Sequence, residues 1–163
     1  MYLRLAMALL LGLLAMPAVD AFAQASQAPA GGANPPPNVQ AIANWVRQNG
    51  RDSTLAAQWL PPLGIGPESL GPIPSRNHSY KIDEDQGATY AFSLIQFEGR
   101  EIMLVARFVP QEMLAWRIDG AGTPMVTIYR DADDKMRTVA SAQYAAQLKQ
   151  VLARLTRIAA TGS

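Results

Sequence analysis

The sequence predicts an α+β domain in which helices flank one antiparallel sheet. Apolar residues recur at helical spacing before residue 60 and after residue 141, and they alternate with the period of a strand from about residue 79 to residue 140. Short turn sequences join the alternating segments, which favours an antiparallel meander because parallel neighbours need a long crossover. The expected order is N-terminal helices, a long loop, a meander of about five strands and a C-terminal amphipathic helix packed on the sheet.

The first 23 residues have the layout of a cleavable secretory signal peptide. Arg4 supplies a positive start, residues 5–15 are an apolar run, and residues 21–23 (Ala-Phe-Ala) form an A-x-A cleavage site. The apolar stretch 3–19 is shorter than the roughly 20 residues that a spanning helix needs, so we expect cleavage and no stable membrane span afterwards. Retention of this leader as a membrane anchor is the alternative.

The composition restricts the compartment and the chemistry. The chain has no cysteine, one histidine and a net charge of +1. An exported domain without disulfides must depend on its core, which favours a bacterial envelope, so the expected location is periplasmic or secreted. A charge near zero gives no electrostatic basis for nucleic-acid binding. We expect no cofactor and no metal, since these residues cannot supply the usual zinc ligands.

The N-terminal part of the expected domain is helical. Residues 24–37 contain small residues, glycine and proline, so they predict a disordered spacer before a single globular domain over 38–160. A first helix is expected over 38–49, with Asn38 as its N-cap. A shorter helix is expected over 53–60, where a proline pair ends it.

A long loop and the strands follow. Residues 61–77 hold five prolines and three glycines, which predicts an irregular loop. Its apolar residues should hold it against the core: Leu63, Ile65, Leu70 and Ile73. The segments with strand alternation, the last of them short, are 79–84, 89–97, 100–109, 113–118, 124–130 and 136–140. A final helix is expected over 142–160, with Ser141 as its cap. Its apolar stripe consists of Tyr144, Leu148, Val151, Leu152, Leu155 and Ile158.

Alternation assigns side chains to the two faces of the sheet if each hairpin is symmetric about its turn. One face is then almost entirely apolar and should pack under the helices; it carries Ile95, Phe97, Ile102, Leu104, Ala106, Phe108, Leu114, Trp116, Ile118, Met125, Tyr129 and Met136. The opposite face mixes apolar residues, among them Tyr90, Phe92, Met103 and Val105, with Arg107, Arg117, Arg130 and Arg137. Because an unpaired buried charge is costly, this face should be partly open to water. A one-residue slip in a hairpin would move its strand to the other face.

These four arginines are the candidate binding residues. They could bind an anionic or carboxylate-bearing partner, because the guanidinium fork matches such groups. Alternatively, they are surface residues paired with carboxylates: Asp83, Glu84, Asp85, Glu101 or Glu112. The sequence predicts no oligomeric state.

Other candidate sites are weaker. His78 lies close in sequence to Asp83 and Asp85, and an alternative interpretation is a small periplasmic hydrolase that uses these carboxylates. Residues 131–135 (Asp-Ala-Asp-Asp-Lys) contain part of a calcium-loop pattern, but they are also typical of a hairpin tip. Among the tryptophans, Trp45 and Trp116 should be core residues.

No catalytic residue is assigned, and whether the chain is an enzyme stays open. The favoured interpretation is an exported, non-enzymatic binding or assembly module that recognises an envelope component or a protein partner. A structural subunit of an envelope assembly is a further alternative.

Overall fold

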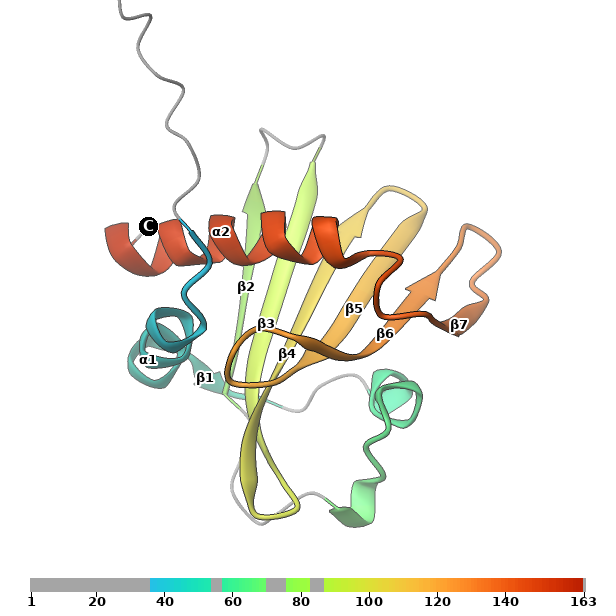
Figure 1. The fold of residues 1–163 in the computed structure, drawn as a ribbon, viewed down its shortest axis with the longest axis horizontal. Helices are drawn as coiled ribbons and strands as arrows, with labels where there is room; N and C mark the ends of the chain where they lie inside the picture. The colour runs from blue at the N-terminus through green and yellow to red at the C-terminus, as the bar shows by residue number, and fades with distance from the viewer. Residues whose placement is uncertain (1–35, 54–56, 70–75, 83–86, 163) are drawn as a thin grey trace, which may run out of the picture. The chain divides into compact units, whose positions relative to one another are not determined.

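A seven-stranded antiparallel sheet forms the centre of the fold, and its strands neighbour one another in chain order (Figure 1). The strands are β1 (Arg51–Asp52), β2 (Arg76–Ile82), β3 (Ala88–Phe97), β4 (Arg100–Val109), β5 (Glu112–Ile118), β6 (Pro124–Arg130) and β7 (Met136–Val139). The α+β class and the antiparallel meander are therefore confirmed. The count of about five strands is only approximate, because β1 adds a two-residue pair to β2 and β7 is a full member of the sheet.

This computed structural model describes residues 36–53, 57–69, 76–82 and 87–162. The chain divides into two compact units, 1–32 and 33–163, and all described residues belong to the second. The predicted leader and all but the last two spacer residues lie outside the described residues, so cleavage and export stay predictions. Within the described ranges, no helix has the length and apolar character needed to cross a membrane.

Helix α1 (Val39–Asn49) forms where its sequence predicts it. The side chain of Asn38 accepts a hydrogen bond from the backbone N–H of Ala41 at 2.9 Å, which satisfies one free donor of the first turn. At the other end, the backbone N–H of Gly50 donates to the carbonyl of Val46 at 2.7 Å. A Cβ atom on Gly50 would lie 2.4 Å from that carbonyl oxygen, so this close approach requires glycine.

Helix α2 (Ala145–Thr161) begins three residues later than predicted, because residues 141–144 form a turn and Ser141 is not its cap. Its predicted stripe is otherwise confirmed: five of the six residues are buried, and Tyr144 is half-buried. Thr156 on this helix accepts a hydrogen bond from the backbone N–H of Asn38 at 2.9 Å. This bond ties the start of α1 to α2, and both helices pack against one face of the sheet.

Three short 3-10 turns follow β1 in the chain: η1 (Ala57–Trp59), η2 (Pro61–Leu63) and η3 (Pro67–Ser69). Trp59, Leu60, Leu63 and Ile65, which belong to or adjoin the first two turns, pack on the opposite face of the sheet. The helix expected over 53–60 is thus matched only by one 3-10 turn, and residues 54–56 lie outside the described part. Prolines at the first position of η2 and η3 allow the chain to turn but not to continue as a long helix. Leu63 and Ile65 are buried as predicted, whereas Leu70 and Ile73 lie outside the described residues.

The hairpins decide which side chains share a face. Glu98 and Gly99 form the predicted two-residue turn between β3 and β4, with φ values of 48° and 71°. The next link also has two residues, because Gln111 adopts a φ of 69° and Val109 pairs with Glu112. A symmetric three-residue link would have paired Val109 with Met113. This one-residue difference changes which side chains share a face: Leu114, Trp116 and Ile118 of β5 lie under the helices as predicted, but they do so together with Tyr90 and Val105 and not with Leu104.

The prediction of which face packs under the helices is therefore wrong in part. The helices cover large residues of β3, β4 and β5: Tyr90, Phe92, Leu94, Met103, Val105, Leu114, Trp116 and Ile118. The face of Ile95, Leu104 and Ala106, expected under the helices, lies under the 3-10 turns instead. Met125 is not part of either core and is 53% exposed, next to the bulge between Arg117 and Ile118.

We call these surfaces the helix face and the turn face. Trp45 and Trp116 are buried in the helix-face core, as predicted.

Candidate functional site

The four candidate arginines do not lie on one surface, so the predicted shared arginine face is wrong. Arg107 and Arg137 are on the helix face, because they pair with Leu114 and Tyr129. Arg117 of β5 and Arg130 of β6 are on the turn face, because they pair with Leu104 and Met113 of that face. A second slip explains Arg137: the β6–β7 link pairs Arg130 with Met136, so β7 is shifted by one residue from the symmetric arrangement.

Arg117 holds the turn segment against the sheet. Its guanidinium carbon lies 5.6 Å from the centroid of the Phe97 ring, and its Nη1 donates to the carbonyl of Gly64 at 3.4 Å. Gly64 has a φ of 75°, and a Cβ atom there would lie 3.0 Å from Arg117 Nη1. Position 64 therefore favours glycine for both its backbone angle and its space.

Arg130 and Arg137 belong to the β6–β7 hairpin tip. Arg137 contacts Asp131 at 2.6 Å, and Arg130 contacts Asp134 at 3.4 Å. The Asp131 carboxylate also accepts from the backbone N–H groups of Asp133 and Lys135. The bonds from Lys135 and Arg137 lower the pKa of Asp131.

The Asp-rich segment therefore uses its first carboxylate for turn bonds. Among the described residues, no group of three His, Asp or Glu side chains could hold a metal ion.

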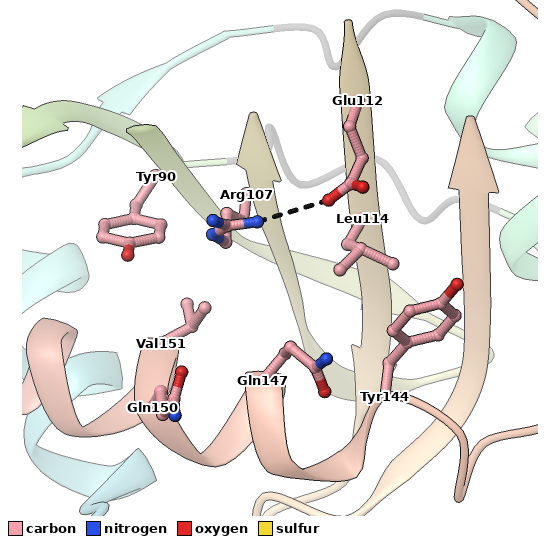
Figure 2. A pocket seen from close by; sticks show the side chains of 8 residues that line it. All are labelled: Tyr90, Arg107, Glu112, Leu114, Tyr144, Gln147, Gln150 and Val151. Carbon is pink, nitrogen blue, oxygen red and sulfur yellow. Dashed lines mark hydrogen bonds and ion pairs between the residues drawn. The ribbon is translucent and has the colours of Figure 1, made fainter. Parts of the chain in front are cut away.

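Arg107 lines a cleft of about 270 Å³ between α2 and the sheet (Figure 2). The lining residues are Tyr90, Arg107, Glu112, Leu114, Tyr144, Gln147, Gln150 and Val151. Two elements of the fold bring them together. On the sheet, Tyr90 and Leu114 are the direct cross-strand neighbours of Arg107, and Glu112 lies diagonally across from it.

The opposite wall comes from the first half of α2. Gln147 and Gln150 are three residues apart, so they lie on one side of the helix, next to the buried stripe. Tyr144, which immediately precedes the helix, stacks on Tyr129 of β6 with ring centroids 5.9 Å apart and an interplanar angle of 8°. This stack fixes the start of α2 against the sheet, and it therefore fixes the edge of the cleft.

An ion pair is the main electrostatic feature of the cleft. Arg107 Nη1 lies 3.4 Å from Glu112 Oε1, and the two side chains are 24% and 36% exposed. Figure 2 shows the guanidinium of Arg107 between Tyr90 and Glu112, with the two glutamines below it on α2. The cleft thus offers a cation, an anion and two amides, which can donate and accept hydrogen bonds. Its charged groups sum to zero.

His78 lies elsewhere, in an aromatic cluster under the end of α1. Its ring centroid is 4.5 Å from those of Trp45 and Tyr80. Burial is the largest cause that lowers the pKa of His78, and the nearby charge of Arg51 lowers it further, while a hydrogen bond with the backbone of Asn49 opposes them. Burial also raises the pKa of Tyr80 to about 12. Asp83 and Asp85, which the hydrolase interpretation needs, lie outside the described residues.

Sequence reasoning found one charged pair of this cleft but missed its other wall. Glu112 was among the carboxylates expected to pair with an arginine, and it pairs with Arg107. The glutamines of α2 carried a weak signal, because polar residues beside an apolar stripe are common on any surface helix.

Searches against protein-family models, curated protein sequences and solved structures find no match to this chain.

Proposed function

We propose that this chain is a small, exported, non-enzymatic binding or assembly module of the bacterial envelope, and that it recognises an envelope component or a protein partner through the Arg107 cleft. The observation that carries this proposal is the Arg107–Glu112 pair at the wall of a 270 Å³ cleft. Ligand sites are concave and largely pre-formed, and a few polar groups at fixed positions orient the ligand. The envelope location rests on the leader sequence.

Arg107 is the best supported of the four candidate arginines. Arg117 is committed to Gly64 and Phe97, and the other two bind aspartates of one hairpin tip. Arg107 instead contacts an acidic residue that lines the same cleft. A ligand that enters the cleft can therefore meet both members of this pair without any change in the fold.

The experiment compares partner capture by matched variants. The full-length protein with a C-terminal tag is expressed with its own leader, cross-linked in intact cells and purified from the envelope. We expect Arg107→Ala to reduce the yield of its specific partners at least tenfold. Arg130→Ala is the control, because it also removes an arginine from a 3.4 Å ion pair, on the other face of the sheet.

Two results would contradict the proposal. If Arg107→Ala and Arg130→Ala capture the partners equally well, the cleft does not take part in partner recognition. Recovery of the protein from the cytosol with residue 1 still attached would remove the envelope location.

A further inference from the structure

The charges that line the cleft limit the class of ligand that it can bind. We infer that the cleft binds a zwitterionic α-amino-acid group, an ammonium and a carboxylate on one carbon, with an uncharged side chain. This inference rests on the proposed function and specifies the chemistry of the same site. It starts from the 3.4 Å separation between Arg107 Nη1 and Glu112 Oε1, which places one full charge of each sign at the same point of the wall.

A ligand of one charge fits this wall poorly. A simple anion would be attracted by Arg107 but repelled by Glu112. A simple cation would be attracted by Glu112 but repelled by Arg107. Like charges brought together at a partly buried contact oppose binding, and a charge left without its partner is costly. A zwitterion offsets both charges at once, because its own two charges are separated by a single carbon.

The ion pair can accept such a ligand without breaking. Within the described part of the chain, the Arg107 guanidinium contacts Glu112 through Nη1, and Glu112 uses Oε1. A guanidinium has five N–H donors and a carboxylate has two oxygens, so donors and an acceptor remain on both. The ligand carboxylate would bind the remaining guanidinium donors, and its ammonium would bind the second oxygen of Glu112.

The size and the other walls limit the rest of the ligand. A volume of about 270 Å³ is just below the roughly 300 Å³ at which sites for drug-sized ligands begin, so it suits a single amino-acid group better than several residues of a polymer. Gln147 and Gln150 supply uncharged donors and acceptors, while Leu114 and Val151 supply apolar surface. Among the described residues that line this cleft there is no third charge, so a charged ligand side chain would lose its hydration without a partner.

The test uses probes that differ by one charge. Isothermal titration of the full-length protein compares L-glutamine, L-leucine and L-alanine with their N-acetyl forms, which lack the ammonium, and with their amides, which lack the carboxylate. We expect at least one free amino acid to bind and both of its blocked forms to bind at least tenfold more weakly. The dipeptide glycyl-glutamine distinguishes a free amino acid from the end of a short peptide, since its two charges are further apart.

Two variants separate recognition from folding. Arg107→Ala should weaken binding of the free amino acid at least tenfold, whereas Arg130→Ala should leave it unchanged. Glu112→Gln should reverse the preference, so that the N-acetyl form binds more tightly than the free form. Loss of structure could not produce this reversal, and thermal unfolding checks that each variant is folded.

The outcomes for the two proposals differ. If no free amino acid binds, or if the N-acetyl form binds as tightly as the free form, the zwitterion inference is wrong. Partner capture that still depends on Arg107 would then leave the proposed function standing. If capture is also unaffected by Arg107→Ala, both fail.

Discussion

On one face of the sheet two helices lie against large side chains, whereas on the other face the segment of η1 and η2 lies over three alanines that larger side chains surround. The contrast is clearest along two neighbouring rows that cross the central strands. The helix-face row consists of Phe92, Val105, Trp116 and Thr127, and the turn-face row consists of Ala91, Ala106, Ala115 and Ile128. Because protein interiors are close-packed, long side chains fill the space between the helices and the sheet, whereas Trp59 and Leu63 fill the space that the short alanine side chains leave on the other face.

This difference also explains where the cleft forms. The helix-face row next to Trp116 contains Tyr90, Arg107 and Leu114, and α2 passes over it with Gln147 and Gln150. A helix is straight and rigid, so it cannot follow the uneven surface of a sheet. The polar side chains in the first turns of α2 do not fill the space between the helix and this row, and the cleft lies there. The turns on the opposite face fit their alanines closely: the space there among Trp59, Leu63 and the alanines is only about 10 Å³.

The largest effect is expected at the centre of the helix face. Trp116 is fully buried between strands and helices. Trp116→Ala should lower the free energy of unfolding by about 3–5 kcal/mol, because it removes a large buried ring and leaves a cavity. Chemical denaturation followed by circular dichroism measures this change.

Trp116→Phe is the matched variant for this site. The Trp116 indole N–H has no hydrogen-bond partner within the described residues, so phenylalanine removes volume without breaking a bond. Its loss should be clearly smaller than that of alanine. Equal losses would contradict the prediction, because the loss of stability would then not follow the volume removed.

An intermediate effect on stability is expected on the turn face, where it comes from added volume and not from removed volume. Ala106→Leu adds volume where only about 10 Å³ is free, so overpacking should lower the free energy of unfolding by about 1–3 kcal/mol. Ala146→Leu is the control, because Ala146 is exposed on α2. Wild-type stability of Ala106→Leu would show that the 3-10 turns move outward at no cost, and the contrast between the two faces would then fail.

The smallest expected effect is the pH dependence of stability that His78, at the edge of the helix face, contributes. The pKa of His78 lies below its ordinary value of 6.5 in the folded chain, mainly because of burial. Protons therefore bind the unfolded chain more readily, so this residue's contribution is complete above about pH 6.5 and is lost as the pH falls through the folded pKa.

Denaturation at pH 7.5 and at pH 5 compares the wild-type protein with His78→Phe, which keeps a ring against Trp45. The wild-type protein should lose more stability on acidification than the variant. The same loss in both proteins would assign the acid sensitivity to other groups.

Local sequence patterns determined the class and most elements of this fold. β4 and β6 have the bounds that alternation predicts, Asn38 caps α1, and Glu98-Gly99 makes its hairpin. Each of these depends on a period or a turn residue within a few positions, and such short-range signals survive in the folded chain.

Only the tertiary structure decided the faces and the cleft. Whether the link after Val109 has two or three residues depends on the positive φ of Gln111, which a glutamine adopts only when the paired strands hold it there. That single turn places Arg107 and Arg117 on opposite faces. Gln147 and Gln150, which line the cleft together with Arg107, lie about forty residues further along the chain. Packing of the helix stripe on the sheet, not any local preference, brings them to one site.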